Sequence, residues 1–218
     1  MTVTDDNRPQ SVMGRALLLM EPFREADGLT LTDLARAAGL PRSSTHRMLL
    51  QLVEVGWLHR RGTTYHLGHK LMELGSLAQR HDRIHRACIG AVHQLHRHTG
   101  AAVHLTVLVE DELLCLEKVG GRWAESLGTY VGQRLPAGEG PWGAALLAHR
   151  AGTTYAVHEH DLNDPAGRPF RHLSLAFDAG QGERAALSLT HPGEQMPAGS
   201  TAALTHAAQG AAELLRTS

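Results

Sequence analysis

The sequence predicts an α+β protein: an N-terminal winged helix-turn-helix, a linker helix, and a C-terminal antiparallel-sheet domain with flanking helices. Three observations lead to this. Residues 30–68 combine helix caps, turn residues and helical apolar spacing with a basic hairpin. Residues 101–119 and 173–190 are β-rich runs that each fold back once. Helical patterns at 84–98 and 200–215 flank these runs, which is typical of an α+β domain.

The composition limits the classes of function. The chain has 218 residues, 42% of them hydrophobic, which is enough for the cores of two small domains. Its formal net charge is −1, so any affinity for nucleic acid must be local. The two cysteines, Cys88 and Cys115, provide no disulfide framework. The N-terminus shows no apolar run typical of a signal peptide or a membrane span, so we expect a cytoplasmic protein without a membrane partner.

The first element after the N-terminus is a helix. Residues 1–10 are polar and unpatterned, which favours a flexible arm. From Ser11 onward, helical spacing is carried by Val12, Ala16, Leu19 or Met20, and Phe23. Pro22 lies late in this run and predicts a kink or an early end. We place the winged helix-turn-helix domain at residues 11–68.

Two short helices follow, joined by a tight turn. Thr30 stands in capping-box relation to Asp33, so a helix begins there. Its apolar positions are Leu31, Leu34, Ala35 and Ala38. Gly39 occupies the position where a left-handed residue ends a helix, and Pro41 is expected to open the second helix at its first position.

The second helix has two unlike faces. Helical stepping places on one side Thr45, Met48, Leu49 and Leu52. The opposite side carries Ser43, His46, Arg47, Leu50 and Glu54, flanked by Arg42 and Ser44. A face that is cationic and rich in donors at its N-terminal end suits the major groove of DNA. The predicted DNA-binding residues on this helix are Arg42, Ser43, Ser44, His46 and Arg47.

A basic hairpin comes next. Residues 57–68 alternate large and polar side chains around Gly62, which predicts a wing with Arg60 and Arg61 at its tip. Residues 40–70 contain five Lys or Arg residues and one acidic residue, Glu54, which gives this stretch a net charge of +4. A solvated basic face is the alternative, but the charge coincides with the helix-turn-helix geometry. Double-stranded DNA is therefore the predicted partner.

A linker helix is expected over residues 69–82. Its apolar stripe consists of Leu71, Leu74, Leu77 and Ala78. Such a stripe between two domains needs a partner, and a second copy of the chain would cover it. We therefore expect a homodimer, with a tetramer as the further option.

The remaining residues, 83–218, predict the second domain. The expected elements are a helix over 84–98, a hairpin turning at Asp111-Glu112, a third strand over 127–132, a helix over 141–149, a hairpin turning through 178–182 and a helix over 200–215. Strands paired in hairpins favour an antiparallel sheet with the helices on one face.

These motifs together resemble the IclR family of bacterial transcription regulators. The resemblance rests on GRALLLMEPF, LTDLARAAGLPRSSTHRMLLQLVEVGWL, YHLGHKLMELG, TGAAVHLTVL, GQRLPA, GAALLA and FDAGQGERAALSLTHP. It implies that the winged helix dimerises and reads a palindromic operator. It also implies that residues 83–218 form a GAF-like domain that binds a small, often acidic or aromatic, effector.

Two departures from the family pattern concern this effector domain. Between Ala148 and the FDAGQGER hairpin the chain has only residues 153–171, broken by Pro and Gly, where the family carries a segment several dozen residues longer. The pocket is expected to be incomplete or rebuilt, and the response to a small molecule lost or altered. Trp142 replaces a small residue, where it either fills the ligand volume or offers a stacking wall.

The positions matching the family's pocket lining are Gly140, Pro141, Trp142, Leu175, Ser188 and Thr190. Ser188 and Thr190 lie two residues apart, so a strand turns both hydroxyls to one face, where they could hold a carboxylate. The alternative is a pair of satisfied hydroxyls on a solvated face.

Metal and enzyme functions are the competing classes. If one helix continues through Ile84, then His81, His85 and Cys88 share a face at spacing suited to Zn²⁺, which would make a metal-responsive regulator. A buried Cys88 with solvated histidines is the simpler interpretation, so no metal or cofactor is predicted. The sequence has no nucleophile elbow, Walker loop or dinucleotide fingerprint, so an enzyme is not expected. A non-DNA-binding scaffold protein would leave the basic face without a role.

Overall fold

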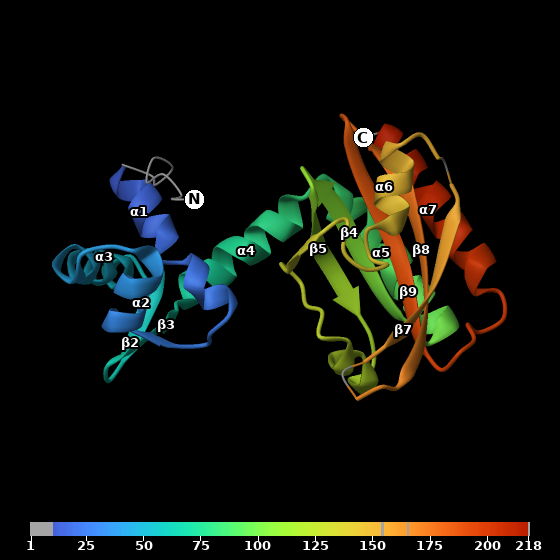
Figure 1. Ribbon diagram of the computed structural model, residues 1–218. Coiled ribbons are helices and arrows are strands. Elements are labelled where there is room, and N and C mark those ends of the chain that lie inside the picture. The colour runs from blue at the N-terminus through green and yellow to red at the C-terminus, as the bar shows by residue number, and fades with distance from the viewer. Residues whose placement is uncertain (1–10, 154, 165, 218) are drawn as a thin grey trace, which may run out of the picture. The chain divides into compact units, whose positions relative to one another are not determined.

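The computed structural model describes residues 11–153, 155–164 and 166–217. The chain divides into two compact units, one ending at Ala78 and the other beginning at Gln79 (Figure 1). The arm expected at residues 1–10 lies outside the described residues. Within the described residues, no helix has both the length and the apolar character needed to cross a membrane.

The first helix ends early, as Pro22 predicted. Helix α1 spans Val12–Leu18, and its N-cap Ser11 accepts a hydrogen bond from the Gly14 amide at 3.0 Å. A separate 3-10 helix, η1, covers Glu21–Arg24 and holds Pro22 in its first turn. The proline lacks an amide hydrogen, so the first turn of a helix is where it costs least.

The helix-turn-helix forms as its caps predict. Helix α2 spans Leu31–Ala38 with the Thr30–Asp33 capping box in place, and Gly39 follows in the left-handed conformation at φ 63°. Helix α3 spans Arg42–Glu54. Pro41 is its N-cap and not its first residue, which corrects the predicted boundary. The Pro41 carbonyl accepts from the Thr45 hydroxyl at 3.1 Å.

The wing follows α3 directly. Strands β2, Leu58–Arg61, and β3, Thr64–Leu67, pair antiparallel, with β1, Leu29–Thr30, on the other side of β3. The two residues of β1 are too few to give a sequence signal. Helix α4, His69–His81, occupies the range expected for the linker helix.

The core of the first unit joins these elements. The buried side of α3 is the predicted one, and it packs with side chains of α1, α2 and the wing. The fully or nearly fully buried members are Leu19, Leu34, Leu49, Leu58 and Tyr65. Because α3 buries one side in this core, its opposite side is fixed toward solvent.

The second unit is built on an antiparallel sheet. Its described strands lie in the order β6-β5-β4-β9-β8-β7. Their bounds are β4 Ala102–Val109, β5 Glu112–Val119, β6 Arg134–Pro136, β7 Val157–Asn163, β8 Pro169–Gly180 and β9 Glu183–Pro192. The helical segments are α5 Arg83–Thr99, η2 Arg122–Leu127, α6 Ala144–Arg150 and α7 Ser200–Arg216.

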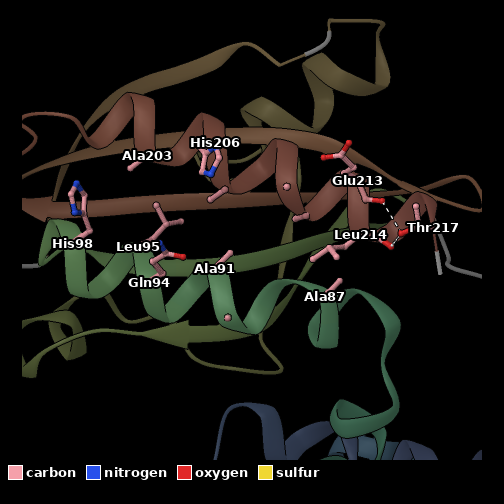
Figure 2. A pocket seen from close by; sticks show the side chains of 14 residues that line it. Ala87, Ala91, Gln94, Leu95, His98, Ala203, His206, Glu213, Leu214 and Thr217 are labelled. Carbon is pink, nitrogen blue, oxygen red and sulfur yellow. Dashed lines mark hydrogen bonds between the residues drawn. The ribbon is translucent and has the colours of Figure 1, made fainter.

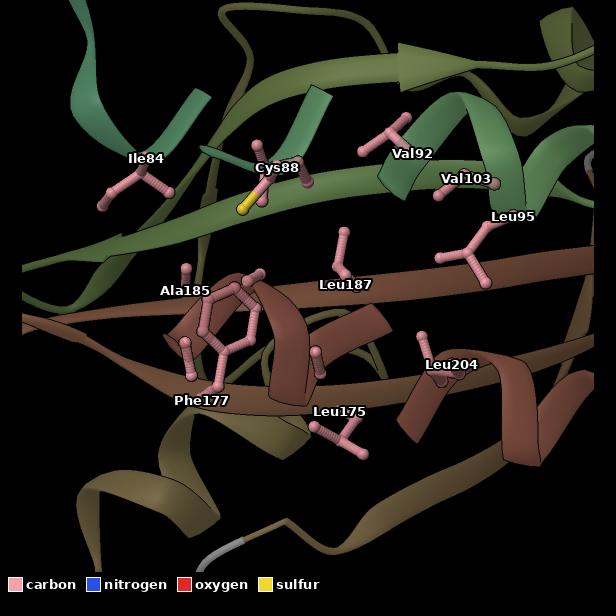
Figure 3. Packing of buried hydrophobic residues seen from close by; sticks show 14 of the residues in the cluster. Ile84, Cys88, Val92, Leu95, Val103, Leu175, Phe177, Ala185, Leu187 and Leu204 are labelled. Carbon is pink, nitrogen blue, oxygen red and sulfur yellow. The ribbon is translucent and has the colours of Figure 1, made fainter. Parts of the chain in front are cut away.

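Helices cover both faces of this sheet, so the prediction that they share one face is wrong. On one face α5 and α7 pack over Leu175, Phe177 and Leu187 in a continuous apolar core (Figure 3). On the other face α6 packs through Ala145 and Leu146 (Figure 1). The strand positions that alternate with the apolar core therefore face α6 and the loops that precede it.

Three further expectations need correction. The strand predicted over 127–132 is wrong, because η2 and a turn occupy that range and the edge strand β6 comes later. The helix expected over 141–149 begins only at Ala144. The segment 153–171, expected to be irregular, contains β7, which pairs with β8 along its whole length. Its sequence, VHEHDLN, is that of a polar edge strand and lacks the apolar run used to recognise strands.

Candidate nucleic-acid interface and candidate effector site

The polar side of α3 is open to solvent. Arg42, Ser43, His46 and Arg47 are exposed and Ser44 is half-buried, while Thr45, Met48 and Leu49 face the core. The seven DNA-binding residues predicted from sequence thus lie on two elements of one domain, α3 and the wing. We keep their role in DNA binding as a prediction.

One side of α3 forms a concave surface with the wing. Its volume is about 340 Å³ and its lining includes Arg42, His46 and Arg60. The Arg42 guanidinium donates a 2.7 Å hydrogen bond to the Thr32 hydroxyl on α2, which holds this side chain at the start of α3. Cationic and donor groups from α2, α3 and the wing therefore converge on one surface.

The other side of α3 faces α1. A second hollow, of about 310 Å³, is lined by Arg15, Ser44 and Arg47, among others. Arg15 belongs to α1 and was not predicted as a site residue. No sequence pattern marks Arg15 as a site residue, because its place beside Arg47 depends on how α1 packs against α3. This adds a fifth arginine to the predicted interface.

The wing arginines project from the strand end next to Gly62. The Arg60 Nε donates to the Gly62 carbonyl at 2.7 Å, and its guanidinium carbon lies 5.6 Å from the centre of the Tyr65 ring. Among the described residues, no carboxylate forms an ion pair with Arg42, Arg47, Arg60 or Arg61. Their charge remains available for phosphate groups.

The second unit contains a buried polar surface. On the sheet face opposite to the apolar core, the strands bury six polar side chains: His104, Thr106, His172, Ser174, Ser188 and Thr190. They are brought together by register, because Ser174 lies opposite Ser188 and His172 lies opposite Thr190 in the β8–β9 pair. His104 pairs with Ser188 across β4 and β9. Because polar side chains converge on this sheet face, we take it as the candidate effector site.

Trp142 covers this surface. Its indole makes edge contacts with the His104 imidazole at 4.7 Å and the His172 imidazole at 4.4 Å between ring centres. The turn that carries it is anchored at Gly143, where an added Cβ would lie 2.0 Å from the Ala137 carbonyl oxygen. The cavity left between Trp142, His104 and Thr106 is about 10 Å³, roughly the space of one water molecule. Trp142 therefore leaves little free volume at this point, and its role in an effector site stays a prediction.

Several polar atoms beneath Trp142 have no hydrogen-bond partner among the described residues. They are His104 Nδ1, Thr106 Oγ1, His172 Nε2, Ser174 Oγ and Ser188 Oγ. The other nitrogens of the two histidines are used: His104 Nε2 bonds to the Thr129 hydroxyl at 2.8 Å and His172 Nδ1 to the Thr190 hydroxyl at 3.0 Å. Leaving a buried polar atom unpaired costs about 1–3 kcal/mol, so these five atoms favour a polar partner over an apolar one at this surface.

Both histidines are electrically neutral at physiological pH. Burial lowers the pKa of His104 to about 3, and the nearby Lys118 ammonium adds to this effect. Burial also lowers the pKa of His172 to about 3, with His104 and His160 as further causes. Each imidazole therefore offers one donor and one acceptor.

The predicted effector residues do not all belong to this surface. Trp142, Ser188 and Thr190 meet there, and Gly140 and Pro141 form the turn that leads to Trp142. Leu175 is a correction: it is fully buried on the opposite face, in the core with α5 and α7 (Figure 3). Its neighbour Ser174 takes the place expected for it, because side chains alternate along a strand. The sequence signal for this surface is the alternation of polar residues along two strands, His172 with Ser174 and His104 with Thr106.

A second hollow in this unit has a different character. A groove of about 660 Å³ runs between the outer sides of α5 and α7 (Figure 2). It is lined largely by small side chains such as Ala87, Ala91 and Ala203. None of the unpartnered buried polar atoms found in the described residues belongs to its lining. It offers volume without the convergent polar groups that orient a ligand.

The structure does not place His81, His85 and Cys88 on one continuous helix, as a metal-responsive regulator would require. The helix does not continue from His81 to His85, because Asp82 ends α4 and caps α5 with an extended backbone. The His85 Nε2 lies 3.0 Å from the Glu117 carboxylate. Burial raises the pKa of the Cys88 thiol to about 12, so the thiolate that a metal needs is disfavoured. Within the described part of the chain, no three His, Cys, Asp or Glu residues are placed to share a metal ion.

Comparison with known proteins finds two family domains along the chain. Residues 12–62 match the IclR helix-turn-helix domain, and residues 76–163 match the bacterial transcriptional regulator IclR C-terminal domain. The regulator KipR of Bacillus subtilis is 29% identical over 143 residues, 65% of this chain and 57% of KipR. XynR of Escherichia coli is 32% identical over 137 residues, 62% of this chain and 54% of XynR. The chain thus spans about half the length of these curated relatives.

Solved structures show the fold. The crystal structure of an IclR homologue from Microbacterium hydrocarbonoxydans, complexed with 4-hydroxybenzoate, matches with a TM-score of 0.76 at 23% identity, covering 95% of this chain and 100% of that chain. The two domain matches together span more than half of the residues, and they coincide with the winged helix-turn-helix and with much of the antiparallel-sheet unit. On this evidence the chain belongs to the IclR family of bacterial transcriptional regulators.

Proposed function

We propose that this protein is a sequence-specific transcriptional regulator that binds double-stranded DNA through α3 and the wing. The observation that supports this most is the solvent-facing side of α3, where Arg42 and Arg47 stand free of carboxylate partners among the described residues and the wing adds Arg60 and Arg61. Regulation of bacterial transcription takes place on cytoplasmic DNA, which is where we place the protein. A protein that served only as a scaffold would not need these exposed arginines on α3 and the wing.

In this proposal α3 reads bases and the wing binds phosphates. Replacing Arg47 with Ala should weaken operator binding by about 1–3 kcal/mol and, if Arg47 contacts guanine, relax the preference at one base pair. Replacing Arg60 and Arg61 together should weaken binding to all sequences alike. Arg97→Ala, an exposed change on α5, is the control and should leave binding unchanged. Competition binding against a set of single-base operator variants measures both effects. If the wing variant altered base preference while Arg47→Ala did not, the two roles would be reversed.

We further propose that the active species is a homodimer on a palindromic operator, with a tetramer as an extension of it. One recognition helix reads too few base pairs for selective regulation. Exposed apolar side chains on α1 and α4 support this: Val12 and Met13 are 62% and 65% exposed, and Leu74 and Leu77 are 40% and 41% exposed. A second copy would cover them.

Polar substitutions in the linker helix should break the dimer. Leu74→Ser with Leu77→Ser should shift the protein to a monomer at micromolar concentration, because it removes apolar area that dimerisation would bury. Val131→Ser, a similarly exposed apolar position in the second unit, is the matched control. Sedimentation velocity, with and without DNA, measures the outcome. A wild-type protein that stays monomeric under both conditions would refute the dimer.

For the second unit we propose a regulatory role with an altered response to small molecules. The supporting observation is the polar surface beneath Trp142, where Ser188 and Thr190 lie with His104 and His172. A homologue of the same fold was crystallised with 4-hydroxybenzoate, which makes a small organic or aromatic effector reasonable. A ligand that prefers one domain arrangement would change the affinity of α3 for DNA.

A further inference from the structure

We propose that the Trp142 indole is a built-in occupant of the effector site, and that the ligand which displaces it is an uncharged aromatic compound carrying hydrogen-bonding groups. This inference rests on the proposed regulatory role of the second unit. It differs from the sequence-based expectation of a carboxylate held by Ser188 and Thr190.

The position of the indole supports the first part. Its ring fits against two imidazoles, with ring centres 4.7 Å from His104 and 4.4 Å from His172. The remaining cavity of about 10 Å³ has no room for a second ring. An aromatic ligand can therefore make the same edge contacts only by taking the place of the indole.

The polar layer beneath the indole supports hydrogen-bonding groups on the ligand. Orphaned atoms of Thr106, Ser174 and Ser188 lie there, together with one nitrogen from each of His104 and His172. All five side chains are at most 5% exposed. An indole has a single N–H donor and no acceptor, and one buried water typically makes about three hydrogen bonds. Neither partner satisfies all of these atoms, whereas an amide group on a ring offers two donors and two acceptor lone pairs at fixed positions.

The charges around the site disfavour a carboxylate. Both imidazoles are neutral, because burial lowers the pKa of His104 and of His172 to about 3. Lys118, the cation that acts on His104, donates to the carbonyls of Ala124 at 2.9 Å and Thr129 at 2.6 Å, and it also interacts with Glu125. The Thr190 hydroxyl is bonded to His172. A buried carboxylate without a free cationic partner carries a large desolvation cost.

The segment that carries Trp142 allows the exchange. Residues 138–140 before it are exposed, and Gly140 takes φ +73°. Trp142 itself is half-buried and not fully enclosed. Gly143 packs against Ala137 and fixes the start of α6. Rotation of the Trp142 side chain would therefore open the site while α6 keeps its contacts with the sheet.

Calorimetry without DNA tests this proposal with a matched pair of probes, benzamide and benzoate, which have the same shape and differ in charge. Each aromatic edge contact changes an equilibrium by about twofold to tenfold. Removing the competing indole in Trp142→Ala should thus tighten benzamide binding at least tenfold over the wild type. Benzoate should bind this variant at least tenfold more weakly than benzamide at pH 7.5. Trp123→Ala, which removes an indole stacked on Phe170, is the control and should behave as the wild type.

Two results would overturn the proposal: equal or tighter binding of benzoate, or no binding of benzamide to a folded Trp142→Ala variant. If that variant does not fold, a protein with Trp57→Phe and Trp123→Phe keeps Trp142 as its single tryptophan. Its tryptophan fluorescence then reports on Trp142 alone. Saturating benzamide should then increase quenching of Trp142 fluorescence by acrylamide, and unchanged quenching would also refute displacement. These measurements need no DNA, so their failure is distinct from a failure of the DNA-binding proposal, which would appear as absent affinity of the ligand-free protein for duplex DNA.

Discussion

Lowering the pH from 8 to 5 should destabilise the second unit by about 4 kcal/mol, because two histidines are buried there in the neutral form. The pKa of His104 and of His172 is about 3 in the folded protein, below the usual 6.5. As the pH falls, the unfolded chain takes up protons first. The stabilisation is therefore complete above pH 6.5 and is lost progressively between pH 6.5 and pH 3. The two sites repel each other when charged, which is one of the reasons that the pKa of His172 is low.

Urea unfolding at a series of pH values measures this loss. His104→Asn should remove about half of the pH dependence, because one of the two neutral imidazoles is gone. The matched control is His93→Gln, since His93 is exposed on α5, and it should keep the full dependence. A free energy of unfolding that is constant between pH 8 and pH 5 would show that the two histidines are solvated, and the description of a buried polar surface would then be wrong.

The first unit was largely predictable from sequence because its signals are local. The capping box of Thr30 and Asp33 and the left-handed Gly39 determine where α2 begins and ends, whatever packs against it. The buried side of α3 follows from helical geometry alone. Arg15 escaped prediction because its place beside Arg47 depends on the packing of α1 on α3, which involves side chains distant in sequence.

The second unit was predictable in its hairpins and less so in its site. The β8–β9 hairpin follows from apolar runs on both sides of a glycine turn. The strand β7 was missed because a polar edge strand shows no apolar alternation. Which of two neighbouring strand residues faces the site depends on register, and Leu175 was placed by resemblance where Ser174 belongs. The contacts of Trp142 with His104 and His172 join residues far apart in the chain, so no local pattern could predict them.

Affinity for DNA should fall steeply with salt, and this is the largest effect expected of the first unit. If Arg42 at the start of α3 and Arg60 and Arg61 of the wing neutralise phosphates in each protomer, a dimer makes about six such contacts, and the logarithm of affinity falls with the logarithm of salt concentration with a slope of about −5. Binding would then weaken by roughly 10³-fold between about 50 and 200 mM salt. The Arg60→Ala, Arg61→Ala protein, which loses about four contacts per dimer, should show a slope reduced by about 3 to 4.

The most direct test of DNA binding by α3 and the wing is therefore a salt titration of wild-type and wing-variant protein against a random duplex and against a duplex selected from a random pool. We expect a steep slope on both duplexes, a shallower slope for the wing variant, and a selected sequence that is an inverted repeat bound far more tightly than the random duplex. A slope near zero on both duplexes, with no sequence enriched, would contradict it.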